Sequence, residues 1–201
     1  MDAIRQIQEI KTYVKDLFLH DTTGHDVEHM QRVAQLAVYI AEKEGADSYL
    51  CEVAAWLHDV GDHKLFDQPD VVKEELQQFL RTLSFTSIEI NTILSIIDSV
   101  SFTKGKRIPD TLEGKIVQDA DRLDAIGAIG IARTFAYGGA KGQRLYDSNE
   151  TNNSSLRHFS DKLLKLRDVM HTRSARGIAE QRHAFMENYL KQFLSEWNFS
   201  E

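Results

Sequence analysis

The sequence has few of the residues that mark disulfide-rich or membrane-spanning proteins. It contains one cysteine, Cys51, which excludes an internal disulfide and a cysteine-rich zinc module and suits a reducing compartment. No stretch reaches the roughly 18 apolar residues that a membrane span needs, and the first residues contain no apolar signal core. We therefore expect a cytoplasmic protein with no membrane partner.

Positive charge is also scarce. The chain has 24 Lys and Arg against 31 Asp and Glu, a formal net charge of −7. Proteins that bind DNA or RNA polymers rely on many Lys and Arg contacts to phosphates, so this balance excludes a general nucleic-acid surface. A small anionic substrate stays compatible with the sequence if basic residues gather locally.

Only two prolines, Pro69 and Pro109, interrupt a chain rich in good helix formers. With 201 residues and a 42% hydrophobic content, the chain is long enough to bury a sizeable core. We therefore expect an all-α protein that forms a single-domain helical bundle over residues 1–201.

Apolar residues recur at intervals of three and four, the spacing that places them on one face of a helix. The predicted helices are about 1–18, one that ends at Gly45, one that begins at Asp47 or Ser48, 71–81, 87–100, one that runs unbroken from Asp110 or Thr111 through Ala136, about 155–170 and about 174–197. Residues 137–155 have no helical period and are rich in Gly, Asn and Ser, which predicts a mobile loop and a candidate lid.

Histidine and aspartate gather in three stretches. These are "HDVEHMQRV" at the start of a predicted helix, "WLHDVGD" at the end of another and "DADRLDAIGA" in the middle of a third. The candidate donors are His29, His58, Asp59 and Asp121. Two imidazoles and two carboxylates form a mixed nitrogen and oxygen set that suits Mn²⁺, Fe²⁺, Co²⁺, Ni²⁺, Zn²⁺ or Mg²⁺. Taken singly, each residue is more often a helix cap or a hydrogen-bonded structural group.

These three stretches, in this order, resemble the HD-domain phosphohydrolase superfamily, whose signature is a histidine, a His-Asp doublet and a later aspartate. The resemblance covers about residues 20–130, and "HFSDKLLKLRDVMHTRSARGIAEQR" is similar to the end of a small bacterial subfamily. It implies an all-α fold and one divalent metal ion, with Mn²⁺ favoured, held by His29, His58, Asp59 and Asp121.

Two residues near this set have open alternatives. Asp124 shares a helix face with Asp121 and is the alternative final ligand, or else the partner of an arginine. His25 lies one helical turn before His29, but the resemblance selects only His29. His25 then either approaches the pocket or caps the helix.

The resemblance also gives Asp62 a candidate catalytic role. Related nucleotide hydrolases often have an acidic residue, in several cases Glu, three positions after the Asp of the doublet. There it orients or deprotonates the attacking water. The alternative is a turn-forming aspartate after Gly61.

Basic residues that bind phosphate oxygens are expected in the C-terminal part of the chain. Residues 157–191 contain eight Lys and Arg against four Asp and Glu, whereas the whole chain is acidic. The preferred pair is His158 and Lys162, and Lys64 and Arg122 are candidates because they are close to the metal motifs in sequence. We expect helices within 155–197 to complete the pocket around a small phosphorylated substrate.

The resemblance implies a metal-dependent phosphohydrolase that acts on a nucleotide. Members of the small subfamily are thought to hydrolyse nucleoside triphosphates to the monophosphate and pyrophosphate, which makes this the leading reaction. The alternatives are a nucleotide monophosphatase or phosphodiesterase, and a non-catalytic HD protein that senses nucleotide or metal. A homodimer is compatible with the sequence.

Overall fold

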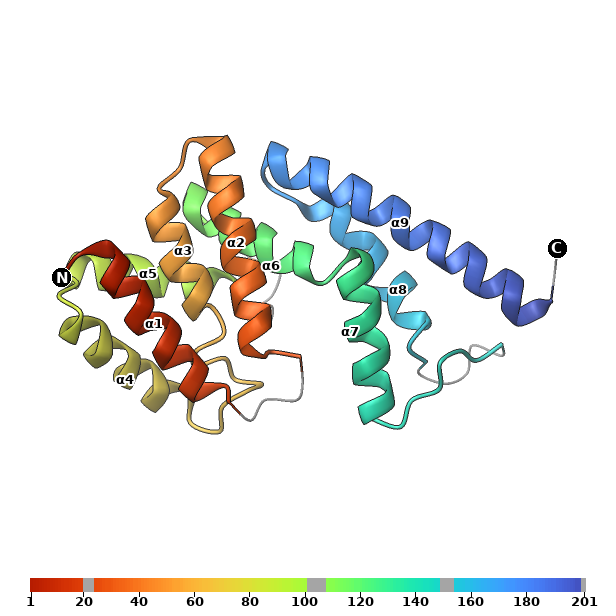
Figure 1. Ribbon diagram of the computed structural model, residues 1–201, viewed down its shortest axis with the longest axis horizontal. Helices are drawn as coiled ribbons and strands as arrows, with labels where there is room; N and C mark the ends of the chain where they lie inside the picture. Colours follow the sequence, from red (N-terminus) through yellow and green to blue (C-terminus); the bar gives the residue numbers. More distant parts are fainter. Residues whose placement is uncertain (20–23, 101–107, 149–153, 200–201) are drawn as a thin grey trace. The chain divides into compact units, whose positions relative to one another are not determined.

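The computed structural model is all-helical, as the sequence predicts, over the residues that it describes: 1–19, 24–100, 108–148 and 154–199 (Figure 1). These residues contain no strand beyond one isolated bridge between Arg144 and Ser154. The helices are α1 (Ala3–Leu17), α2 (Val27–Glu44), α3 (Ser48–Leu57), α4 (Pro69–Thr82), α5 (Ser87–Val100), α6 (Leu112–Asp124), α7 (Gly127–Ala140), α8 (Arg157–Asp161) and α9 (Arg173–Asn198), with a 3₁₀ helix at Leu163–Val169.

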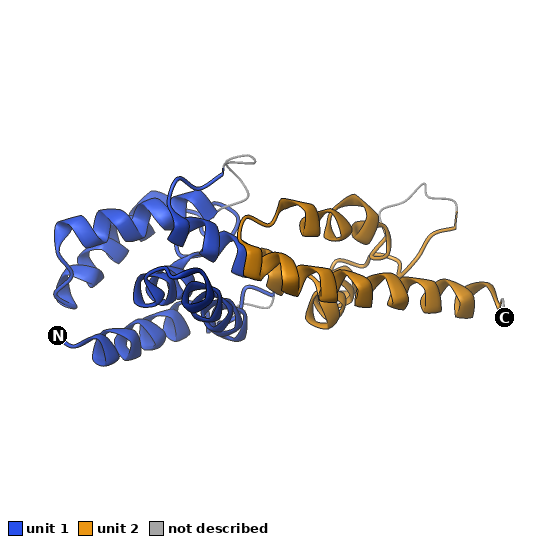
Figure 2. Cartoon of the chain, turned by 90° about the horizontal axis from the view of Figure 1, so that it is seen from above, with its two compact units in different colours: residues 1–121 blue, residues 122–201 orange. Residues whose placement is uncertain are grey.

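The chain divides into two compact units, Met1–Asp121 and Arg122–Glu201 (Figure 2). The first unit contains α1 to α5 and most of α6. The second contains the last residues of α6 together with α7, α8, the 3₁₀ helix and α9.

Helix α3 forms the centre of the first unit. It packs against α1, α2 and α5, and Cys51, Val53, Ala54 and Leu57 are fully buried. The Asp47 side chain accepts a hydrogen bond from the Leu50 backbone N–H and so caps the start of the helix. Burial on several sides makes α3 a rigid support for the residues that follow it.

The second unit is held together by α9. Helix α7 and the 3₁₀ helix both pack against it. Aromatic rings link these elements, because Phe135 of α7 contacts Tyr189 and Phe193 of α9, and Phe159 of α8 stacks on Tyr189.

The unbroken helix predicted through Ala136 is wrong, because α6 ends at Asp124 and α7 begins at Gly127. Gly127 has a φ of 78°, a left-handed value that glycine adopts at little cost and other residues avoid. A Cβ at Gly130 would lie 2.2 Å from the Ala125 carbonyl oxygen, so the chain turns too tightly there for a side chain. The glycines in "AIGAIGIA" therefore permit a break that helical periodicity does not reveal.

The predicted helix over about 155–170 is also corrected. It is divided into the five-residue α8 and the 3₁₀ helix, with Lys162 between them at φ −134°. The predicted loop 137–155 begins later than expected, since α7 continues to Ala140. Part of this candidate lid, residues 149–153, lies outside the described residues.

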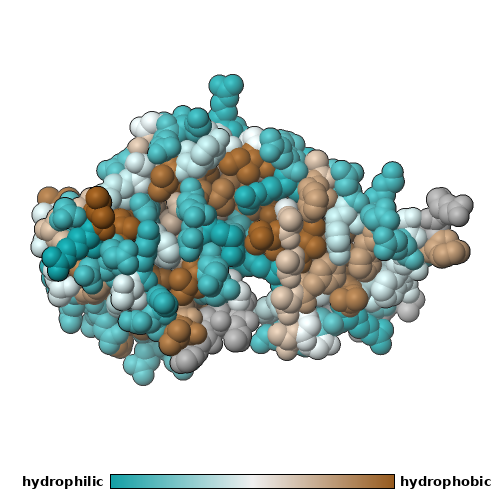
Figure 3. Space-filling view, viewed as in Figure 1, coloured by the Kyte–Doolittle hydropathy of each residue, from teal (hydrophilic) through white to brown (hydrophobic). Residues whose placement is uncertain are grey.

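The helices carry polar side chains on their outer faces. Hydrophilic residues cover much of the face shown in Figure 3, with smaller groups of hydrophobic residues between them. Among the described residues, no helix combines the length and apolar character needed to cross a membrane.

Candidate metal centre

The first donor, His29, is positioned by the start of α2. The Asp26 side chain accepts a hydrogen bond from the His29 backbone N–H at 2.8 Å, which caps the helix. His29 lies in the first turn and is fully buried. Its imidazole is therefore held inside the first unit rather than in solvent.

The end of α3 positions the His-Asp doublet. Nδ1 of His58 lies 2.8 Å from the Ala55 carbonyl oxygen. A carbonyl oxygen can only accept a hydrogen bond, so Nδ1 carries a proton, and in the neutral tautomer with that proton Nε2 has the lone pair. This arrangement, a histidine with one nitrogen fixed by a backbone carbonyl, is typical of metal ligands.

Four donor atoms from three segments converge in the first unit. Nε2 of His29 lies 3.6 Å from both Asp59 Oδ2 and Asp121 Oδ1. Nε2 of His58 lies 3.5 Å from the same Asp59 oxygen and 3.8 Å from the same Asp121 oxygen. These four nitrogen–oxygen distances are close to the roughly 3.5 Å that separates two donors bound to one ion at about 2.1 Å, so the spacing fits a small divalent cation.

The electrostatics of this cluster also favour a cation. Nε2 of His58 is buried and has no hydrogen-bond partner among the described residues. When the ring is neutral, its Nε2 lone pair faces two carboxylate oxygens, and these like-signed groups repel each other in a poorly solvated space. A divalent ion among them would convert the repulsion into attraction. The His/Asp cluster thus has the chemistry of a metal site.

The Asp59 carboxyl group is ionised in this environment. Burial alone would raise its pKa, but the charge of a protonated His58 and the close polar contacts of His25 and His29 have a larger combined effect. They hold the pKa of Asp59 well below its ordinary value. Asp59 therefore presents a carboxylate rather than a neutral acid.

Asp121, and not Asp124, lies with the histidines. The donor atoms of His29, His58 and Asp121 are all within 4.8 Å of one another. Asp124 is almost fully buried and accepts a hydrogen bond at 2.6 Å from Nη1 of Arg133, within the second unit. Asp124 has thus taken the alternative role of an arginine partner.

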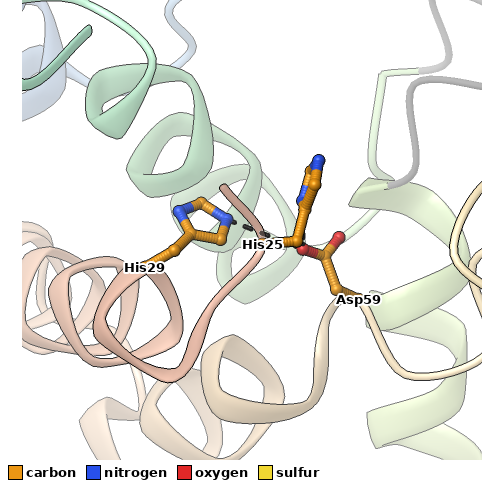
Figure 4. Close-up of side chains that lie close together, drawn as sticks. All are labelled: His25, His29 and Asp59. Carbon is orange, nitrogen blue, oxygen red and sulfur yellow. Dashed lines mark hydrogen bonds and ion pairs between the residues drawn. The ribbon is translucent and has the colours of Figure 1, made fainter. Parts of the chain in front are cut away.

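His25 joins the cluster, although the sequence comparison did not select it. Figure 4 shows His25, His29 and Asp59 converging, and Nδ1 of His25 lies 2.8 Å from Asp59 Oδ2. Its donor atom is within 4.8 Å of those of His29 and Asp59. The available signal was its spacing of four residues before His29, which places the two rings 5.6 Å apart.

Asp62 lies in the turn after the doublet. Its Oδ1 accepts a hydrogen bond from the Lys64 backbone N–H at 2.8 Å, and its own N–H donates to the Asp59 carbonyl oxygen. Asp62 and His58 line the same small hollow, together with Lys73 and Asp98. The turn-forming role is therefore present, next to the donor cluster.

Lys73 is a neighbour that the sequence patterns did not reveal. Its Nζ forms an ion pair of 2.5 Å with Asp98, joining α4 to α5. Gly61 has a φ of 76°, and a Cβ there would lie 2.7 Å from Lys73 Cγ. The lysine stem therefore packs on the glycine of the Asp62 turn.

The four predicted phosphate-binding residues are spread over the chain. Lys64 is exposed in the first unit, two residues after Asp62. Arg122 is buried in the second unit, where its guanidinium donates to the Val169 carbonyl oxygen. His158 and Lys162 lie at α8, and partial burial and the Lys162 charge lower the pKa of His158.

Comparisons with known proteins bear on the whole chain. The profile of the HD domain matches residues 26–126. The YpgQ protein of Bacillus subtilis is 43% identical over 198 residues, which cover 96% of this chain and 94% of YpgQ. The crystal structure of YpgQ in complex with ADP has a TM-score of 0.82 at 44% identity, covering 94% of this chain and 96% of that one. An HD-superfamily hydrolase from Bacillus thuringiensis has a TM-score of 0.83 at 42% identity, covering 98% of this chain and 99% of that one.

Proposed function

Because the chain belongs to the HD domain family, we propose that it is a divalent-metal-dependent phosphohydrolase that acts on nucleotides. The observation that carries the proposal is the buried His58 Nε2, which lies 3.5 and 3.8 Å from oxygens of the Asp59 and Asp121 carboxyl groups. The crystal structure of the similar YpgQ protein with ADP supports a nucleotide as the ligand class.

The chain's own residues have distinct roles in this proposal. His29, His58, Asp59 and Asp121 would hold the ion, with Mn²⁺ the favoured metal. When bound, a divalent cation supplies Lewis-acid stabilisation of phosphate charge and makes a nearby water more acidic. Asp62, whose carboxylate is oriented by the Lys64 backbone N–H, would orient the attacking water and accept its proton.

The proposed substrate carries negatively charged phosphate groups, which basic side chains would neutralise. Lys64 belongs to the same unit as the four donors, and its ammonium group would neutralise a phosphate oxygen. Arg122, His158 and Lys162 belong to the second unit, and their part in substrate binding stays a prediction.

The specific reaction that we propose is hydrolysis of a nucleoside or deoxynucleoside triphosphate. Water attacks the α-phosphorus, the bond from that phosphorus to the α,β-bridging oxygen breaks, and pyrophosphate leaves with the electron pair. The water's proton passes to Asp62, and the second product is the nucleoside monophosphate. A monophosphatase would instead release inorganic phosphate, and a phosphodiesterase would open a diester.

Product analysis tests this proposal. The metal-free protein is incubated with each deoxynucleoside triphosphate and Mn²⁺, and the products are followed by ³¹P NMR. We expect pyrophosphate and monophosphate in equal amounts. Release of inorganic phosphate as the first product would refute the pyrophosphohydrolase assignment, and an absence of turnover would refute the enzyme assignment.

A variant pair separates catalysis from nucleotide sensing. Asp62→Asn removes the proposed proton acceptor, and Asp67→Asn removes an exposed aspartate five residues later in the same connection. We expect Asp62→Asn to lower kcat by about 10²- to 10⁴-fold, the usual contribution of a general base, and Asp67→Asn to keep wild-type kcat. Equal kcat in wild type and Asp62→Asn, with metal still bound, would refute the role of Asp62.

A further inference from the structure

One oxygen of Asp59 is shared between a histidine outside the proposed ligand set and two inside it. Nδ1 of His25 lies 2.8 Å from Asp59 Oδ2 (Figure 4). Nε2 of His29 and of His58 lie 3.6 and 3.5 Å from that oxygen. The shortest of these distances is that of a hydrogen bond, and the two longer ones match the spacing of ligands around a common ion. His25 and the two other histidines therefore use the oxygen differently.

The chemistry of the pair fixes the direction of this hydrogen bond. A carboxyl group that binds a divalent cation does so as a carboxylate, which can only accept a hydrogen bond. Nδ1 of His25 must then carry the proton and donate it to Oδ2. A carboxylate oxygen has more than one lone-pair direction, so it can accept from His25 and still bind a cation.

The His25 ring is in turn held by its own segment. His25 directly precedes Asp26, the capping residue of α2, and its ring meets the His29 ring edge-on at an interplanar angle of 90°. Its side chain is 37% exposed, and that of Asp59 is 13% exposed. His25 therefore lies on the outer side of the cluster and covers the more deeply buried carboxylate.

We propose that His25 is a positioning residue that orients Asp59 for metal binding through its Nδ1–H donor. The inference rests on the proposed function, since it requires that Asp59 is a metal ligand. Hydrogen-bond partners of metal ligands fix the ligand's orientation, and their loss typically costs 10- to 100-fold in metal affinity. His25 would act on the ion only through Asp59, without binding it.

Three substitutions at this position separate the donor from the rest of the ring. His25→Ala removes the ring, His25→Asn places an amide N–H close to the Nδ1 position, and His25→Gln places one close to the Nε2 position. Glu42→Gln is the control, because Glu42 is exposed near the other end of α2 from His29. Calorimetric titration of Mn²⁺ into each metal-free protein gives affinity and stoichiometry without any need for turnover.

We expect His25→Ala and His25→Gln to weaken Mn²⁺ binding by about 10- to 100-fold, at an unchanged stoichiometry of about one ion per chain. His25→Asn should restore most of the lost affinity, and Glu42→Gln should bind like wild type. Thermal unfolding followed by far-UV circular dichroism checks that each metal-free variant is folded.

The outcomes distinguish this inference from the function on which it rests. If wild type binds no Mn²⁺, the metal-dependent function is refuted, and the role of His25 with it. If wild type binds Mn²⁺ and His25→Ala binds it equally well, only the role of His25 is refuted. Equal losses in His25→Asn and His25→Ala would show that the Nδ1–H donor is not the cause, and loss of one of two bound ions would make His25 a ligand instead.

Discussion

Neutralising Asp121 should remove most of the stabilisation that a bound metal gives to the fold. Asp121 Oδ1 lies 3.6 and 3.8 Å from the Nε2 atoms of His29 and His58, and Asp121→Asn keeps the shape of the side chain while removing its charge. A ligand that binds only the folded state stabilises it by about 2.7 kcal/mol at 100 times its Kd. For a chain of 201 residues, that corresponds to a rise in Tm of roughly 5 to 10 °C.

The metal-induced stabilisation should be much smaller in Asp121→Asn than in wild type. If Asp121→Asn weakens binding about 100-fold, the same Mn²⁺ concentration contributes only about 0.4 kcal/mol, or a rise of about 1 °C. The assay is differential scanning calorimetry of each protein with Mn²⁺ and with EDTA. The quantity compared is the Mn²⁺-induced change in Tm.

Asp124→Asn is the matched control, because Asp124 is on the same helix but pairs with Arg133. We expect a lower Tm in EDTA for this variant, since it leaves a partly buried arginine without its carboxylate partner. Its Mn²⁺-induced rise should equal that of wild type. A full rise in Asp121→Asn, or the loss of the rise in Asp124→Asn alone, would refute the assignment of Asp121.

Two further predictions concern the helix that supports the doublet and the turn that follows it. Burial, with smaller effects from Glu113 and Asp47, raises the pKa of Cys51 to about 12, so the native thiol should resist a thiol reagent at pH 8 and react at once in denaturant. Because the folded thiol stays protonated to a higher pH than the unfolded one, the stability is at its full value below pH 9 and falls as the pH rises toward 12. Rapid labelling of the native protein would contradict the burial. Gly61→Ala should destabilise the protein by more than Gly45→Ala in urea unfolding, since both glycines have positive φ but only at Gly61 would the new Cβ crowd a neighbouring side chain. Equal losses in the two variants would contradict this reasoning.

Most helices could be predicted from the sequence because their signals are local. The apolar pattern of 87–100 matches α5 in full, and Asp47 caps α3 as one of the two predicted alternatives. The break before Gly127 could not be predicted, because glycine also occurs in continuous helices and its φ depends on the packing around it. Periodicity indicates which faces are buried, but it does not show where a chain turns.

In the donor cluster, too, some residues could be identified from local sequence motifs, whereas one contact could be seen only in the folded structure. His29, His58, Asp59 and Asp121 stand out by motif, and the structure brings their donor atoms together. The contact of His25 with Asp59 joins residues 34 positions apart, and its only local signal was the spacing to His29. Such contacts depend on how helices pack, which one sequence does not specify.

The central claim is that the His/Asp cluster holds a divalent metal ion, and metal content measures this most directly. Protein purified without a histidine tag is dialysed against Mn²⁺ and then against metal-free buffer. Its metal content is measured by inductively coupled plasma mass spectrometry. We predict about one divalent ion per chain in wild type and almost none in His58→Ala. A wild type without metal, or a His58→Ala variant with the wild-type amount, would contradict the claim.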